Sequence, residues 1–302
     1  MPATVEARSK EPLAKSASPF TDRPVEQAIQ SRLHAGGKAL VPFFIAGFPN
    51  DARFVDALRQ AADVSCDVVE VGIPFSDPIA DGPAIQSAGH RCLERGMTVR
   101  RALDLIDRAA ISVPVVLMSY VNPLLSYGCE RLLRDALAVG VRGLIIPDLP
   151  LKMRSPSEKG PVLIGNPDPL DTVDRVWSEG LERILLAAPT TQKKHLSRIG
   201  RQTHGFLYAV TVTGVTGVRD RLSQETVAFL RRAKAATRRP VLAGFGIASA
   251  KSAAHIAAHC EGVIIGSALI GILQRNSRRE AVKQLGRFLV QVRRALSERK
   301  GG

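Results

Sequence analysis

Residues 68–86 read Val68-Val-Glu-Val-Gly-Ile-Pro-Phe-Ser-Asp-Pro-Ile-Ala-Asp-Gly-Pro-Ala-Ile-Gln86. The stretch opens with a short β-branched run, at residues 67–71, which is typical of a strand buried in a parallel sheet. Gly72 and Pro74 end that strand and begin a loop. Glu70 is therefore expected at the C-terminal end of a strand whose other residues are apolar.

The loop after this strand carries two further carboxylates, Asp77 and Asp81, each next to a proline or a glycine. Pro74, Pro78 and Pro83 restrict the loop in the unfolded chain, which favours one rigid folded form. Acids at the ends of barrel strands are often catalytic, so a rigid acidic loop beside a strand-end glutamate favours a functional site. The alternative is a solvated acidic turn.

The composition is that of a globular protein. With 302 residues, 45% of them hydrophobic, the chain can form one large α/β domain or two small ones. It contains neither a run of eighteen apolar residues nor an apolar segment at its start, so we expect no membrane span and no secretory signal. The four cysteines are far apart in sequence, which argues against a zinc site and a disulfide scaffold and favours the cytoplasm.

The chain is strongly basic, with 42 Lys and Arg residues against 28 acids and a net charge of +14. Such a charge suits nucleic acid, and a nucleic-acid binder would show steep salt dependence. However, the basic residues are spread along the predicted helices, and aromatic residues, at 5%, offer few surfaces on which bases could stack. The pattern favours solvated helix faces, with some long-range attraction for an anionic substrate. We therefore expect neither a nucleic-acid nor a membrane partner.

Strand and helix patterns alternate along the chain. After a polar tail at residues 1–22, an amphipathic helix is expected at residues 24–34, because Val25, Ile29 and Leu33 share one face. Strands are expected at residues 39–46, 67–71, 114–118, 143–146, 183–187, 205–210, 240–243 and 262–265. Helices are expected at residues 51–65, 85–96, 98–110, 125–140, 168–180, 192–203, 224–237, 249–259 and 278–299. This alternation predicts an α/β fold, a single (β/α)8 TIM barrel over residues 23–302 with an extra N-terminal helix.

In such a barrel the active site lies at the C-terminal ends of the strands, where Glu70 and Asp81 fall. Burial should raise the pKa of Glu70, which suits a group that gives and takes a proton near neutral pH. Asp81, on a loop, should stay ionised and can accept a hydrogen bond from an N–H group. Two acids in different environments can play different roles.

Two glycine motifs follow the last two predicted strands. Gly244-Phe245-Gly246 comes after the seventh, and Gly266-Ser267-Ala268 comes after the eighth and opens a helix. Loops at these positions of a barrel commonly bind phosphate through backbone N–H groups and a helix N-terminus. Either motif alone is more simply a tight turn, but the two together favour a phosphate site.

The sixth strand carries Tyr208, and the loop at residues 211–222 beyond it contains Gly214 and Gly217. This loop is expected to be a mobile lid, the alternative being an ordinary exposed turn. An apolar lining that would suit a flat aromatic ligand, or that simply fills the barrel, comprises Phe43, Met118, Tyr120 and Phe245. The histidines show no metal-ligand spacing, so neither a metal nor a cofactor is expected.

The run from Glu70 to Pro83 closely resembles the signature of the tryptophan synthase alpha subunit family, the indole-3-glycerol phosphate aldolases. Val71 and Ile79 replace leucines of the family pattern. Further motifs resemble the family in the same order, at residues 46–47, 119–123, 147–150, 188–191, 205–208, 214–217, 244–247 and 266–268. The resemblance implies a retro-aldol cleavage of indole-3-glycerol phosphate to indole and glyceraldehyde 3-phosphate, a step of tryptophan biosynthesis.

The resemblance also implies roles for individual residues. Glu70 would protonate the indole C3, Asp81 would hold the indole N–H, and Tyr208 would line the site and help to orient Glu70. The other matched residues would contact the substrate or close over it: Phe43, Tyr120 and Phe245 around the indole, Thr216 beside Asp81, and Gly217, Gly246, Gly266 and Ser267 around the phosphate.

In this family the loops after the second, third and fourth strands help to meet a pyridoxal-phosphate-containing beta subunit. Here the sequence departs from the family after Pro150, with Leu151-Lys-Met-Arg154 followed by the unfamiliar residues 155–166. The departure leaves three alternatives: an ordinary alpha chain, a stand-alone lyase that supplies free indole, and a non-catalytic activator of a beta-type partner. Retention of Glu70 and Asp81 argues against the activator, and their pairing argues against a sugar-phosphate isomerase or epimerase.

Overall fold

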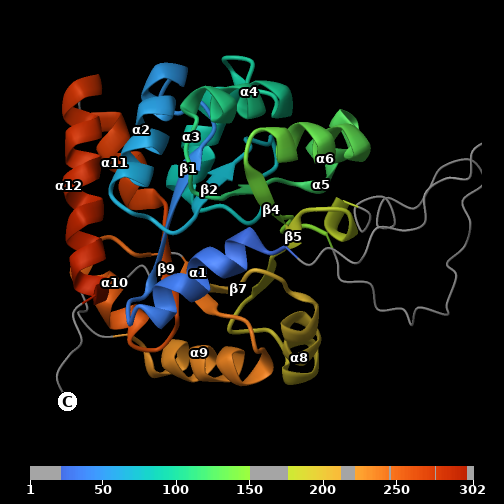
Figure 1. Ribbon diagram of the computed structural model, residues 1–302, viewed down its shortest axis with the longest axis vertical. Helices are drawn as coiled ribbons and strands as arrows, with labels where there is room; N and C mark the ends of the chain where they lie inside the picture. Colours follow the sequence, from blue (N-terminus) through green and yellow to red (C-terminus); the bar gives the residue numbers. More distant parts are fainter. Residues whose placement is uncertain (1–21, 150–175, 212–221, 245, 276, 298–302) are drawn as a thin grey trace, which may run out of the picture.

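The computed structural model describes residues 22–149, 176–211, 222–244, 246–275 and 277–297. Within them nine parallel strands form one sheet in the order β5-β4-β3-β2-β1-β9-β8-β7-β6. The strands are β1 Ala39–Ile45, β2 Val69–Gly72, β3 Val115–Met118, β4 Val141–Ile145, β5 Glu182–Arg183, β6 Leu185–Ala187, β7 Leu207–Val210, β8 Val241–Gly244 and β9 Gly262–Ile265. Figure 1 shows the strands at the centre with the helices around them, as the predicted barrel requires.

The predicted fifth strand, at residues 183–187, is present as two consecutive segments, β5 and β6, separated by Ile184. The N–H group of Ile184 donates to the carbonyl of Leu144 in β4 at 3.2 Å. The next N–H group, that of Leu185, donates to Oγ1 of Thr203 at 3.1 Å. Because β5 pairs with β4 and β6 pairs with β7, the two segments together close the barrel.

The described helices are α1 Pro24–His34, α2 Asp51–Asp63, α3 Pro83–Leu93, α4 Val99–Ala109, α5 Val121–Tyr127, α6 Cys129–Ala138, α8 Lys193–Gln202, α9 Gln224–Ala236, α10 Ala250–Ala257, α11 Ser267–Arg275 and α12 Arg278–Ser297. α12 packs against α2, α10 and α11 on one side of the barrel (Figure 1). In the described part of the chain, no helix has both the length and the apolarity to cross a membrane.

One helix prediction is wrong. Residues 125–140 were expected to form a single helix, but they belong to two, α5 and α6. Gly128 lies between them with a φ of 90°, a backbone conformation that glycine adopts without steric cost. Its N–H group donates to the carbonyls of Leu124 and Leu125, both at 3.1 Å, and so ends α5.

α1 is the extra N-terminal helix that the sequence predicts. Glu182, at the start of β5, accepts hydrogen bonds from the N–H groups of Val25 at 2.6 Å and Glu26 at 3.2 Å. These are among the N–H groups that a helix leaves without an internal partner at its first turn. Because Glu182 begins its strand, α1 lies at the N-terminal end of the barrel and leaves the opposite end for the site.

A second anchor lies just before β2, where Asp67 is 7% exposed. Its carboxylate accepts hydrogen bonds from Arg32 of α1 at 2.8 Å, from Arg293 of α12 at 2.7 Å and from the N–H group of Leu40 in β1 at 2.8 Å. One buried side chain thereby connects two helices and two strands. This connection holds the start of the strand that carries Glu70.

Candidate active site

Glu70 occupies the second position of β2 and is completely buried. Successive side chains of a strand point to opposite faces, so Val69 and Val71 face the helices while Glu70 faces the barrel interior. Neither of its carboxylate oxygens has a hydrogen-bond partner among the described residues. Burial, together with the smaller effect of the nearby Asp81, raises the pKa of Glu70 to about 8. Glu70 is therefore largely protonated at neutral pH and has its hydrogen-bonding capacity available for a ligand.

Asp81 ends the loop that follows β2. The loop turns back on itself, because the N–H group of Asp81 donates to the carbonyl of Pro78 at 3.1 Å. Burial raises the pKa of Asp81 to about 6, against the effect of a hydrogen bond from the Tyr120 side chain, which lowers it. Asp81 is thus largely ionised at neutral pH, and the two acids of the site differ in charge.

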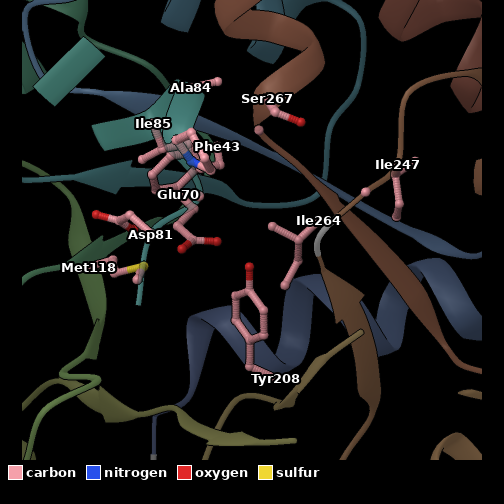
Figure 2. Close-up of a pocket in the computed structure, with 14 residues that line it drawn as sticks. Phe43, Glu70, Asp81, Ala84, Ile85, Met118, Tyr208, Ile247, Ile264 and Ser267 are labelled. Atoms are coloured by element: carbon pink, nitrogen blue, oxygen red, sulfur yellow. The ribbon is translucent and has the colours of Figure 1, made fainter. Parts of the chain in front are cut away.

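Tyr208 reaches the same space from β7, and Figure 2 shows its hydroxyl pointing towards Glu70. Burial raises the pKa of Tyr208 well above its usual value, and the charges of Glu70 and Asp81 raise it further, so the phenol remains protonated. Gly244, in the neighbouring strand β8, makes room for it: a Cβ atom at that position would lie 2.4 Å from the Tyr208 hydroxyl.

These side chains surround a cavity of about 350 Å³. This is within the range of roughly 300–1,000 Å³ of small-molecule sites. The cavity is lined by Phe43, Glu70, Asp81, Gly82, Pro83, Ala84, Ile85, Met118, Tyr208, Gly246, Ile247, Ile264, Gly266 and Ser267. In Figure 2, Asp81 and Met118 lie on one side of the cavity, and Ser267 and Ile247 lie on the other. An elongated ligand could therefore contact the acids at one end and the helix start at the other.

Phe43, from β1, forms an apolar wall between these ends. Two glycines leave room for its ring. A Cβ atom at Gly72 would lie 2.7 Å from the ring, and a Cβ atom at Gly266 would lie 2.8 Å from it. Ile85 and Ile264 add further apolar surface to the cavity. Such a wall suits a flat aromatic group.

The far end of the cavity is built from backbone. Gly246 has a φ of 70°, and α11 begins directly after Gly266, whose carbonyl accepts the N–H groups of Leu269 and Ile270. Since Gly266 and Ser267 line the cavity, α11 begins at its wall, and a helix N-terminus favours an anion. None of the described lining residues is a lysine or an arginine. An anion here would be held by backbone N–H groups, the helix dipole and the hydroxyl of Ser267.

The cavity brings together most of the residues that the sequence singles out: Phe43, Glu70, Asp81, Tyr208, Gly246, Gly266 and Ser267. Tyr120 is not among its described lining residues, and its hydroxyl is instead hydrogen-bonded to the loop that carries Asp81. Thr216, Gly217 and Phe245 lie outside the described residues, as do almost all of the predicted lid, the N-terminal tail and residues 155–166.

Sequence reasoning did not find Ile85, Ile247 or Ile264. The signal for Ile264 lies in β9, where alternation from Gly262 places it inside the barrel. For Ile85 no local signal exists, because only the position of α3 brings it to the cavity. No group of three or more metal-binding side chains occurs within the described residues.

The chain is similar to known proteins over most of its length. The family model "Tryptophan synthase alpha chain" matches residues 29–298. The tryptophan synthase alpha chain of Carboxydothermus hydrogenoformans is 41% identical over 254 residues, covering 83% of this chain and 89% of that protein. The one from Geobacter sulfurreducens is 37% identical over 265 residues, covering 87% and 95%.

Solved structures agree in fold. Tryptophan synthase subunit alpha from Legionella pneumophila superposes with a TM-score of 0.77 at 30% identity, covering 91% of this chain and 99% of that one. A chain of the Mycobacterium tuberculosis tryptophan synthase superposes with a TM-score of 0.74 at 32% identity, covering 91% and 98%.

Proposed function

The chain belongs to the tryptophan synthase alpha chain family, and on that premise we propose that it cleaves indole-3-glycerol phosphate to indole and glyceraldehyde 3-phosphate. The observation that carries the proposal is the pairing in one cavity of a protonated Glu70, which has no hydrogen-bond partner among the described residues, with an ionised Asp81. A retro-aldol cleavage needs a proton donor at carbon and a charge that stabilises the resulting cation. The four free cysteines suit a reducing compartment, and we propose that the reaction takes place in the cytoplasm.

The first step is proton transfer from Glu70 to C3 of the indole, which gives a cationic indolenine-like intermediate. Asp81 accepts a hydrogen bond from the ring N–H, where the positive charge develops. Because this interaction strengthens as the charge forms, it stabilises the transition state more than the ground state. Tyr208 can donate a hydrogen bond to the Glu70 carboxylate once that group has lost its proton.

In the second step the hydroxyl on the side-chain carbon next to the ring loses its proton to the Glu70 carboxylate. The bond between that carbon and C3 breaks, the oxygen becomes the aldehyde of glyceraldehyde 3-phosphate, and the bonding electrons return to the ring. The ring gains one proton at C3 and the hydroxyl gives one up, so Glu70 ends the cycle protonated. A carboxyl with a raised pKa suits both transfers.

The substrate's two ends match the two ends of the cavity. The indole fits against Phe43, close to the carboxylates, and the phosphate fits at Gly246, Gly266 and Ser267. A dianion placed at the start of α11 meets backbone N–H groups of the first turn and the positive end of the helix dipole. Phosphate binding would thereby hold the reacting carbon near Glu70, and such fixed orientation contributes strongly to rate.

The test is indole release from indole-3-glycerol phosphate by the purified chain, compared with Glu70→Gln. Glutamine keeps the shape of the side chain but cannot transfer the proton, so turnover should fall about 10²–10⁴-fold, the usual contribution of acid–base catalysis. Glu182→Gln is the matched control, because Glu182 is equally buried but lies at the other end of the barrel. Turnover of Glu70→Gln within a few fold of wild type would refute the assigned role.

A further inference from the structure

We propose that Tyr120 is a positioning residue that holds the Asp81 carboxylate in its ionised form, ready to accept the indole N–H. The inference rests on the proposed function, and it gives Tyr120 a role other than lining the substrate pocket. It starts from the observation that the described lining of the cavity lacks Tyr120, although this side chain is only 2% exposed.

The Tyr120 side chain contacts both ends of the loop after β2. Its ring stacks on Phe75, near the start of the loop, with the ring centroids 5.1 Å apart and an interplanar angle of 29°. Its hydroxyl accepts the N–H of Ala80, the residue before Asp81, at 3.0 Å, and its hydrogen-bonding effect lowers the pKa of Asp81. One side chain therefore contacts the loop near its beginning and, at its end, holds the backbone directly before Asp81.

The backbone on either side of Tyr120 is itself anchored to the neighbouring strand and its loop. The N–H of Ser119 donates to the carbonyl of Ile145 in β4 at 3.0 Å. The N–H of Val121, which begins α5, donates to the Asp148 carboxylate after β4 at 3.0 Å. Tyr120 is thus a rigid support rather than a mobile surface group.

The groups around Asp81 make this support important. The charge of Asp81 raises the pKa values of Glu70 in β2 and Tyr208 in β7, and Asp148 raises the pKa of Tyr120. All three are acids or phenols, so none favours a negative charge electrostatically. Within the described residues, the Tyr120 phenol is the one group that lowers the pKa of Asp81, by a hydrogen bond that favours the charged form.

The experiment compares Tyr120→Phe with Tyr127→Phe. The first keeps the ring on Phe75 and removes only the hydroxyl. The second is a matched control, because the Tyr127 hydroxyl also donates to a carboxylate, that of Asp135 at 2.6 Å, on the outer helices of the barrel. In Tyr120→Phe the acid limb of kcat/KM should move to higher pH. At pH values below the acid limb, kcat/KM should be about tenfold or more lower than in wild type, as expected for a lost hydrogen bond to a charged group.

A second measurement does not depend on activity. The carboxyl carbon of Asp81, assigned with Asp81→Asn, is titrated by carbon-13 NMR in wild type, Tyr120→Phe and Tyr127→Phe. The midpoint should rise only in Tyr120→Phe. If the chain releases no indole, the proposed function fails, and this titration still tests Tyr120. An unchanged midpoint, an equal fall of kcat/KM at every pH, or an equal shift in Tyr127→Phe would overturn the inference.

Discussion

At the scale of single residues, Glu70 and Asp81 share one cavity but differ in their hydrogen-bond partners. Glu70 has none among the described residues, and Asp81 has the Tyr120 phenol. A buried carboxyl without a partner favours its neutral form, and one that accepts a hydrogen bond keeps more of its charge. In the proposed function, the same chemical group, a carboxyl, therefore serves as a proton donor in Glu70 and as a negative charge in Asp81.

The pH dependence of kcat/KM should follow from these two states. Below about pH 6 Asp81 becomes protonated and can no longer hold the indole N–H as an anion. Above about pH 8 Glu70 loses the proton that it must give. The activity should therefore peak between these values, as a rate profile of kcat/KM against pH would show. In Asp81→Asn the acid limb should vanish, and a wild-type profile that keeps rising through pH 8 would contradict the assignment.

At the scale of elements, the start of α11 and the end of β1 are interlocked. Gly266 precedes α11, and its lack of a side chain leaves room for the ring of Phe43 from β1. In the proposed function, Gly266 therefore has two effects. It leaves the backbone accessible to the phosphate, and it leaves room for the Phe43 ring against which the indole packs.

Gly266→Ala tests this arrangement. The new Cβ atom would lie 2.8 Å from the Phe43 ring and must displace it. Overpacking of this kind costs about 1–3 kcal/mol of stability. Because the strain also displaces the backbone at the start of α11, where the phosphate is proposed to bind, the affinity for glycerol 3-phosphate, measured by calorimetry, should fall about tenfold. Gly271→Ala, within α11, is the control because nothing lies within 4 Å of its added Cβ atom. It should leave the affinity unchanged, and equal effects of the two substitutions would argue against the interlock.

The Asp67 anchor makes a prediction about stability. Asp67→Ala leaves the guanidinium groups of Arg32 and Arg293 without their shared carboxylate. Breaking a buried ion pair in this way should lower the free energy of unfolding by about 3–5 kcal/mol, as measured by urea unfolding. Asp104→Ala removes the exposed partner of Arg100 and should cost less than about 1 kcal/mol. If the free energy of unfolding falls no more for Asp67→Ala than for the control, the Asp67 anchor contributes little to stability.

At the scale of the whole molecule, the open question is the partner. Relatives of this chain are alpha chains of tryptophan synthase. From the sequence, a departure from that family is predicted at residues 151–166, which lie outside the described residues, in a loop that the resemblance assigns to contact with a beta subunit. A partner shaped for a different loop would meet a clash or a reordering, each of which lowers affinity. The chain is therefore expected to release indole unaided.

Mixing the chain with a tryptophan synthase beta subunit from a relative tests this expectation. Association is measured by sedimentation and the lyase rate by indole release, with that relative's own alpha chain as the control. Weak association and little stimulation are expected. A tight one-to-one complex with a large rate increase would instead make this chain an ordinary alpha subunit.

Sequence patterns alone predicted the kind and order of most described elements, and they identified about half of the residues that line the candidate site. Strand and helix periodicities are local properties, so the barrel could be predicted, and a glutamate in an apolar strand stands out without a structure. The break at Gly128 was missed because the apolar pattern continues across it, whereas the positive φ of that glycine exists only in the folded chain.

Tertiary structure decided the partners of the site residues. That Glu70 has no hydrogen-bond partner among the described residues, and that Tyr120 faces Asp81 rather than the cavity, depend on how the loop after β2 meets the residues that follow β3. Hydrogen bonds and burial are set by groups from separate segments, and it is these that separate the pKa values of two carboxylates of similar intrinsic acidity. The residues of the site could therefore be read from the chain, whereas their protonation states required the fold.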